Sequence, residues 1–187
     1  MEESGIIGRG TLYVLLGKLC VFFLGVLNVS LVPMILGPEN MGFYSYWLAV
    51  LIILLAALDL GGPIILTRYL PELRKTNPNS IKSLIKKTVE LKFPFIFIML
   101  ISGLFFFPNR YYFTIILIAS LFSSINSIIA KILYAYNDMG KYSFVQFARV
   151  LTRLILVVLF FIIIGDIGIL YGLLGGAMLV TFIFGSF

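Results

Sequence analysis

Residues 51–58 read Leu-Ile-Ile-Leu-Leu-Ala-Ala-Leu, a stretch that would be apolar on every side of a helix. A transmembrane β-strand would instead alternate in polarity over about ten residues. The stretch therefore predicts a helix buried in lipid and protein. Asp59 and then Gly61-Gly62-Pro63 follow it directly. We expect the helix to kink or open there, because proline lacks a backbone donor and glycine is conformationally permissive.

The rest of the chain shares this apolar character. Of its 187 residues 61% are hydrophobic and 12% are charged, and the mean hydropathy is +1.11. A soluble domain is about half apolar and about a quarter charged, and it could not hide this much apolar surface from water. The composition argues against a soluble enzyme, a disordered chain and a nucleic-acid-binding domain. It indicates an integral membrane protein.

About six segments are predicted to cross the membrane, because a helical span needs about 20 mostly apolar residues. They cover residues 11–36, 42–70, 91–107, 111–136, 142–164 and 168–187. Gly37-Pro38-Glu39-Asn40 is expected to end the first span. The longer polar stretch 71–90 contains a predicted short amphipathic helix on the membrane surface, residues 80–87. The expected fold is an all-α, polytopic membrane bundle that forms one domain over residues 1–187.

The basic residues indicate the orientation, because they flank spans on the cytoplasmic side. All but one of the basic residues that flank the predicted spans fall on the same side if the N-terminus is cytoplasmic. The opposite side receives only Arg110, together with Glu39 and Asp166. We therefore predict a multi-pass protein of the cell (plasma or inner) membrane with a cytoplasmic N-terminus. The net charge of +6 then marks topology and attraction to anionic lipid, and a nucleic-acid partner is not expected.

Two ionisable residues, Lys18 and Asp59, are predicted to lie at membrane depth. A charge within a span is costly unless it is paired or wetted, so such residues are candidates for function. Backbone carbonyls exposed at the predicted break beside Asp59 could bind a cation together with its carboxylate. Alternatively, Asp59 could simply pair with Lys18.

Polar residues also form stripes on two later spans. The fourth span carries one at spacings of four, three and four, with Ser123 and Asn126 beside it: Ser120, Ser124, Ser127 and Lys131. The fifth span carries Arg149 and Arg153, which share one helix face. Together these faces could line a wet cavity for an anionic head group, since arginine binds phosphate in a bidentate way. Snorkelling to the interface could also explain Lys131 and both arginines, and helix packing could explain the serines.

Small and aromatic residues suggest how the helices pack. Gly168, Gly172 and Gly176 recur every four residues and are predicted to let a neighbouring helix approach closely, with dimerisation as the alternative. Five aromatic residues are expected to form an outer aromatic belt: Tyr44, Tyr46, Trp47, Tyr111 and Tyr112.

The reactive side chains are few. The chain has no histidine, and Cys20 is its only cysteine. An intrachain disulfide and an ordinary Cys/His zinc site are thereby excluded. A membrane-embedded lipid-phosphate transferase would need clustered carboxylates or a histidine, whereas the eight acidic residues are scattered. We predict no enzymatic activity, no catalytic residue, no metal site and no cofactor.

Several motifs resemble one family. Residues 36–47, Leu-Gly-Pro-Glu-Asn-Met-Gly-Phe-Tyr-Ser-Tyr-Trp, resemble the "G-x-x-x-x-G-x-Y" segment that leads into the second helix of polysaccharide-biosynthesis flippases. Asp59-Leu-Gly-Gly-Pro, followed by Thr67-Arg68-Tyr69, is similar to the "D-L-G-L…R" segment that ends it. The sequences at residues 9–13 and 134–142 are also of this type. The chain thus resembles an O-antigen-flippase-like member of the multidrug/oligosaccharidyl-lipid/polysaccharide exporter superfamily.

The resemblance implies a role and partners. Such proteins look like two six-helix lobes around a cavity, and they flip polyprenyl-linked oligosaccharides by alternating access. This chain resembles the N-terminal lobe, so the implied partners are membrane lipids, the lipid-linked oligosaccharide, and a missing C-terminal lobe or a second copy. The candidate contacts for the pyrophosphate are Lys18, Arg68, Arg149 and Arg153, of which only Arg68 lies in a family motif. Asp59 is implied to be structural or ion-coupling.

Two other functions stay open from the sequence. One is a cation-coupled small-molecule exporter of the same superfamily, in which Asp59 would serve the coupling ion. The other is a non-transporting scaffold or accessory subunit that packs against a partner through the glycine face.

Overall fold

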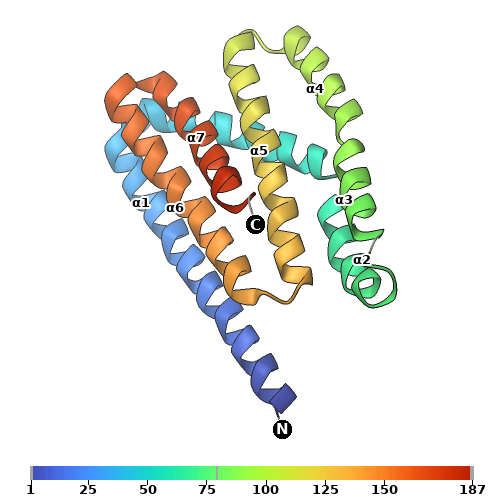
Figure 1. Cartoon of the computed structure of the whole chain (residues 1–187). Helices are drawn as coiled ribbons and strands as arrows, with labels where there is room; N and C mark the ends of the chain where they lie inside the picture. Colours follow the sequence, from blue (N-terminus) through green and yellow to red (C-terminus); the bar gives the residue numbers. More distant parts are fainter. Residues whose placement is uncertain (1, 79, 186–187) are drawn as a thin grey trace.

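The computed structural model describes residues 2–78 and 80–185 (Figure 1). The described residues form helices joined by short connections, with no strand among them, which confirms the predicted all-α fold. The helices are α1 (Glu2–Asp59), α2 (Gly62–Thr76), α3 (Ser80–Glu90), α4 (Phe93–Phe106), α5 (Arg110–Ala135), α6 (Met139–Ile164) and α7 (Asp166–Phe184). Among them, four are long and apolar enough to cross a membrane: Leu12–Asp59 within α1, and α5, α6 and α7.

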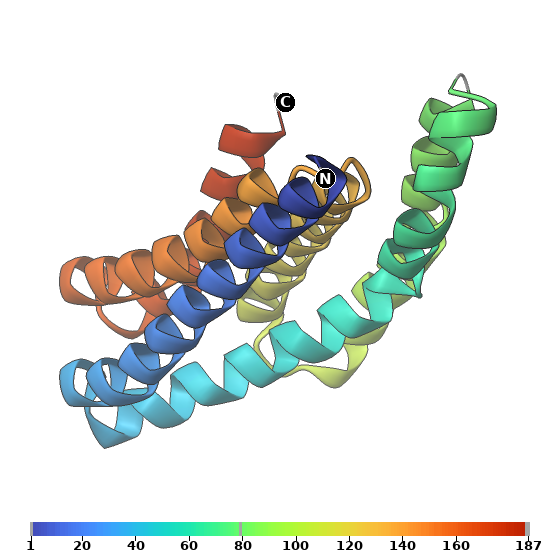
Figure 2. The same ribbon diagram turned by 90° about the horizontal axis from the view of Figure 1, so that it is seen from below.

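α1, which is bent sharply, contains the first predicted span and the part of the second that precedes Asp59. Gly37 has φ 76° and ψ 171°, a left-handed conformation that suits glycine, and Pro38 follows at a position where proline starts a new helical turn. Figure 2 shows the two halves of α1 running apart from this bend. The predicted turn is therefore confirmed, but it is a kink rather than a separate loop.

The second predicted span is divided, and the third corresponds to a single shorter helix that is not among the four long apolar helices. The second breaks at Leu60 (φ 42°) and Gly61 (φ 74°), so that α1 ends at Asp59 and α2 begins at Gly62. The third consists of α4, which α3 precedes with only Leu91 and Lys92 between them. The expected break beside Asp59 is confirmed, and so is a helix over the stretch predicted to be amphipathic.

The tightest packing joins α6 and α7. A Cβ atom added at Gly168 would lie 2.0 Å from the Phe160 carbonyl oxygen, and one added at Gly172 would lie 2.4 Å from Val157 Cα. At Gly176 it would lie 2.9 Å from Arg153 Cα. The predicted close approach is confirmed, and the backbone of α6 fills this glycine face.

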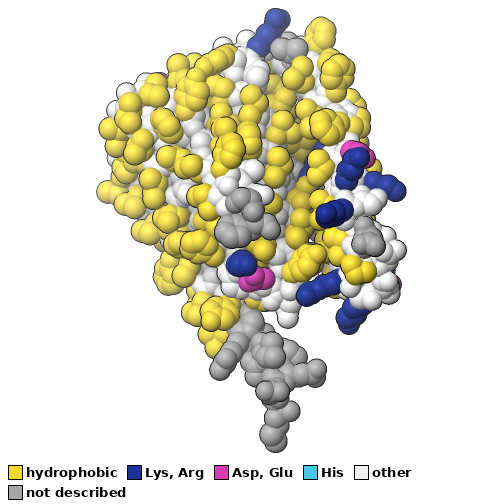
Figure 3. Space-filling model, viewed as in Figure 1, with side chains coloured by type: hydrophobic (Ala, Val, Ile, Leu, Met, Phe, Trp, Pro, Cys, Tyr) yellow, Lys and Arg dark blue, Asp and Glu magenta, His cyan; other side chains and the backbone are white. Residues whose placement is uncertain are grey.

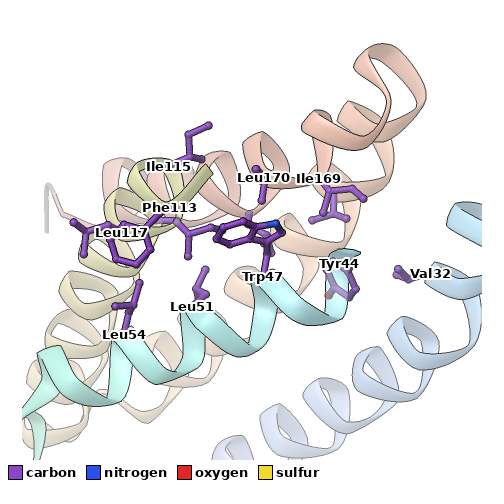
Figure 4. Packing of buried hydrophobic residues seen from close by; sticks show 14 of the residues in the cluster. Val32, Tyr44, Trp47, Leu51, Leu54, Phe113, Ile115, Leu117, Ile169 and Leu170 are labelled. Atoms are coloured by element: carbon purple, nitrogen blue, oxygen red, sulfur yellow. The ribbon is translucent and has the colours of Figure 1, made fainter. Parts of the chain in front are cut away.

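The main apolar core joins the second half of α1 to α5 and α7 (Figure 4). Tyr44 and Trp47 lie inside it and are only 2% and 4% exposed, so their assignment to an outer belt is wrong. Their spacing with Leu51 and Leu54 places them on the face of α1 that packs inward. Tyr46 and Tyr111 are exposed, as a belt would require.

The connections sort by end of the molecule, as the charge pattern predicts. In Figure 1 the α2–α3 and α5–α6 connections lie at the same end as the start of α1, and the α4–α5 and α6–α7 connections lie at the opposite end. Figure 3 shows most of the visible Lys and Arg side chains over the lower and right part of the molecule. This arrangement agrees with the predicted topology.

The glycine contact generates a stability prediction. We expect Gly172→Ala to lower the free energy of unfolding by about 1–3 kcal/mol, because the added methyl group must displace the α6 backbone. Gly175→Ala is the matched control on the same helix, since its Cβ would meet only the tip of Leu156 at 3.3 Å and Phe160 at 3.6 Å. Thermal unfolding in detergent measures both variants, and equal destabilisation would contradict the packing.

Candidate functional site

Four polar side chains meet beside the α1–α2 and α3–α4 connections. We call Asp59, Lys92, Ser124 and Ser127 the polar centre. Lys92 Nζ donates to Asp59 Oδ1 at 3.2 Å and also contacts Ser124 Oγ. Ser124 Oγ donates to the same carboxylate oxygen at 2.7 Å, and Ser127 Oγ donates to Asp59 Oδ2 at 3.3 Å. Both oxygens of this carboxylate are therefore engaged.

The backbone explains how these residues come together. Asp59 is the last residue of α1, and Lys92 is the residue just before α4. The negative end of the α1 dipole favours an ammonium group at this point. The serines lie on α5 one turn apart, so both reach the same carboxylate. The Lys92 side chain is 7% exposed and that of Asp59 25%, so the pair is largely shielded from the surroundings.

The partner of Asp59 differs from the sequence hypothesis. Asp59 pairs with Lys92 and not with Lys18. Lys18 is exposed on the first half of α1, where it lines a groove of about 230 Å³ with Tyr142, Ser143 and Gln146 of α6. The bend at Gly37 and the break after Asp59 decide this pairing, because they bring α4 rather than the first half of α1 to the carboxylate.

The two arginines of α6 occupy a different environment. Arg149 and Arg153 are half-buried and lie one turn apart on α6. The Nε atom of Arg153 is buried and has no hydrogen-bond partner among the described residues. A buried donor left unpaired costs about 1–3 kcal/mol. A hydrogen-bond acceptor at this nitrogen would remove that cost.

The predicted basic residues are only partly brought together. Gln146, Arg149 and Arg153 share one face of α6, and Lys18 lies across the groove from Gln146. Arg68 does not join them: it is exposed on α2, with its guanidinium carbon 5.6 Å from the ring centroid of Tyr69. Arg149 and Arg153 thus share a face of α6, Lys18 lies on α1 beside Gln146, and Arg68 lies apart from all three.

The predicted serine stripe also divides. Ser124 and Ser127 bind Asp59, whereas Ser120 donates to the Leu117 carbonyl oxygen of its own helix at 2.7 Å. Lys131 is half-buried, with Nζ 5.9 Å from the ring centroid of Tyr134 near the end of α5. Only the middle of the stripe therefore belongs to the polar centre.

A family model described as "Polysaccharide biosynthesis protein" matches residues 7–187. The chain belongs to this family. No curated protein and no solved structure matches it significantly. The family resemblance stated from the motifs is thereby confirmed. Family membership and the long apolar helices together identify the protein as a membrane transporter related to polysaccharide biosynthesis.

Sequence reasoning gave no structural role to Asn126, Thr181 or Lys92 of this family member. Asn126 Nδ2 donates to the Ala177 carbonyl oxygen at 2.9 Å, and Thr181 Oγ1 donates to Asn126 Oδ1 at 3.0 Å, which joins α5 to α7. The charge pattern places Lys92 among the basic residues that follow the second predicted span and gives it no further role. Its position between Leu91 and Phe93, at the start of an apolar run, was the available signal that it enters the bundle.

The polar centre generates a second stability prediction. We expect Lys92→Met to lower the free energy of unfolding by about 3–5 kcal/mol, because it leaves the Asp59 carboxylate without its counter-charge. The double variant Asp59→Asn/Lys92→Met leaves no charge unpaired, and we expect its free energy of unfolding to fall clearly less than that of Lys92→Met. Chemical unfolding of the four members of this double-mutant cycle measures the coupling.

Lys86→Met provides the control for this cycle. It breaks the exposed Lys86–Glu90 pair, whose atoms are 3.6 Å apart, and such pairs contribute at most about 1 kcal/mol. Additive losses for the two substitutions at Asp59 and Lys92 would show that the pair is not an energetic unit.

Proposed function

We propose that this protein takes part in flipping lipid-linked oligosaccharide across the cell membrane for surface polysaccharide biosynthesis, and that Arg149 and Arg153 contact the pyrophosphate of the lipid carrier. The observation that carries this proposal is the buried Nε of Arg153, which has no hydrogen-bond partner among the described residues. It lies on a helix long and apolar enough to span a membrane. Family membership supplies the polysaccharide context.

The chemistry of the arginine pair suits a phosphorylated lipid. Two guanidinium groups one turn apart present several N–H donors in planar arrays that match phosphate oxygens. Their charges are costly in a membrane unless an anion or water compensates them. A pyrophosphate group would meet both needs, and Lys18 with Gln146 would extend the polar surface along the α1–α6 groove.

The snorkelling alternative fits some of these cations better than others. Lys131 lies near the end of α5 beside Tyr134, as an interfacial anchor would. Arg153 does not fit that description, since its Nε is buried and its Cα is packed against Gly176 of α7. The two residues therefore support different roles.

The other candidate functions lose their main support. The cation-coupled exporter depends on Asp59 as an ion ligand, whereas Lys92, Ser124 and Ser127 engage both carboxylate oxygens. The accessory-subunit hypothesis depends on the glycine face, which α6 fills. We propose that the protein is not an enzyme, that its cavity is completed by a second lobe or a second copy, and that lipids cover its apolar outer surface.

The arginine pair generates a functional prediction. We expect Arg149→Gln and Arg153→Gln each to reduce export of lipid-linked sugar about 10- to 100-fold, the loss expected for one charged hydrogen bond of about 1.5–3 kcal/mol. The measurement is surface polysaccharide in complemented cells with matched protein levels. Lipid-linked oligosaccharide should accumulate inside these cells.

Two further arginines serve as controls. Arg110→Gln changes an exposed arginine at the opposite end of the bundle and should leave export at the wild-type level. Arg68→Gln separates the family motif from the α6 face, and we expect a smaller loss because Arg68 lies apart on α2. Normal export by both α6 variants would exclude the proposed pyrophosphate contact.

A further inference from the structure

A mostly apolar trough runs along α2 and α3. Its larger part has a volume of about 410 Å³ and is lined by Ile65, Tyr69, Glu72, Leu73, Thr76 and Leu84. A second hollow of about 180 Å³ shares Ile65 and Leu84 with it and continues to Asp59 and Lys92 of the polar centre. The two hollows therefore form one continuous trough that leads from the end of α2 to the polar centre.

The opposite face of α2 is packed and leaves the trough open to the surroundings. Leu66 and Leu70 are buried in one cluster with Ile81 of α3 and Ile128 of α5. Ile65 and Tyr69, which line the trough, are 42% and 44% exposed. The trough is therefore a fixed feature of the bundle surface.

The trough matches one bilayer leaflet in depth and length. At its inner end Asp59 accepts a hydrogen bond from Ser124, near the middle of α5. Near its other end Arg74, two residues before Thr76, donates to the carbonyl oxygen of Tyr136, just after α5. From Ser124 to Tyr136 the chain rises about 18 Å along α5, and half the hydrocarbon core of a bilayer is about 15 Å. One acyl chain would therefore fit along the trough.

Three exposed cations flank the trough. Lys87 of α3 lines its inner part. On α2, Arg68 and Lys75 are seven residues apart, so they share one helix face, and each comes directly before a residue that lines the trough. Glu72 offsets one of these charges, so the edge keeps a net positive charge. Figure 3 shows Lys and Arg side chains gathered over the part of the molecule where Figure 1 places α2 and α3.

Two other cations of α3 lie away from the trough. Lys82 and Lys86 are exposed, and each is two residues from Leu84. At 3.6 residues per turn this spacing places them about 160° around the helix from that lining residue. They belong to the same basic surface but cannot edge the trough, which makes them a matched comparison.

We propose that this trough binds an anionic phospholipid of the cytoplasmic leaflet, with one acyl chain along the apolar floor and the phosphate group beside Arg68 and Lys75. Basic residues near a membrane surface attract anionic lipids, and their long apolar stems let the charged ends reach the head-group level. A zwitterionic lipid would fill the floor equally well but has no net charge to match the edge. The proposal goes beyond the pyrophosphate contact on α6 and does not depend on the transported substrate.

Quenching by brominated lipid tests this site in the full chain, reconstituted in bilayers of phosphatidylglycerol and phosphatidylcholine. Tyr69→Trp, in a Trp47→Phe background, places the only tryptophan in the trough and keeps an aromatic ring beside Arg68. Bromine on the acyl chains of one lipid at a time reports the relative occupancy of the two lipids there. We expect phosphatidylglycerol to be preferred by at least about fivefold, the factor expected from one cation near an anionic surface.

Charge substitutions distinguish a local site from general attraction to a basic surface. Arg68→Gln/Lys75→Gln should remove most of the preference for phosphatidylglycerol at the Tyr69→Trp reporter. Lys82→Gln/Lys86→Gln removes the same number of charges from the opposite face of α3 and should leave the preference unchanged. Equal losses in the two double variants would overturn the local site.

A second reporter position separates the trough from the lipid around the whole bundle. Phe182 is 68% exposed on α7, next to Thr181, which contacts Asn126 of α5 at a depth similar to that of Ile128 behind the trough. Phe182→Trp should show almost no preference between the two lipids. An equal preference there, or none at Tyr69→Trp, would overturn the proposal. Polyprenyl phosphate added as a trace component should leave the quenching unchanged, and loss of quenching would overturn the phospholipid as the occupant.

Discussion

Charge compensation inside an apolar bundle is the constraint around which this structure is arranged. Asp59 would be costly in a membrane segment without partners, and the fold supplies them from two other places, Lys92 before α4 and the serines of α5. This single carboxylate therefore joins the end of α1, the start of α4 and the middle of α5. The position of α2 and α3 follows, since they are attached on either side of it.

The same constraint distinguishes the arginines of α6 from Asp59. Asp59 is satisfied within the chain, whereas the buried Nε of Arg153 has no partner among the described residues. A buried donor without a partner can be satisfied by water, by an ion or by a ligand. This contrast separates the structural polar centre from the proposed pyrophosphate contact.

Backbone proximity provides the second organising feature. Glycines of α7 let the backbone of α6 approach closely, and the Cα atom of Arg153 packs against Gly176. Hydrogen bonds of Asn126 and Thr181 join α5 to α7. Close approach of this kind replaces the hydrophobic driving force that a membrane does not provide between helices. The orientation of the proposed contact residues thus depends on small residues on a neighbouring helix.

The sequence by itself determined the helical class, the approximate spans, the kinks at Gly37 and Gly61 and the glycine packing face, because these follow from local hydropathy and backbone preferences. It also carried the family motifs. Only the tertiary structure decided that Asp59 pairs with Lys92 rather than Lys18, that Tyr44 and Trp47 face the core, and that Arg68 lies apart from Arg149 and Arg153. Those outcomes depend on the angles at which the helices leave each break, and no periodicity within a single segment encodes them.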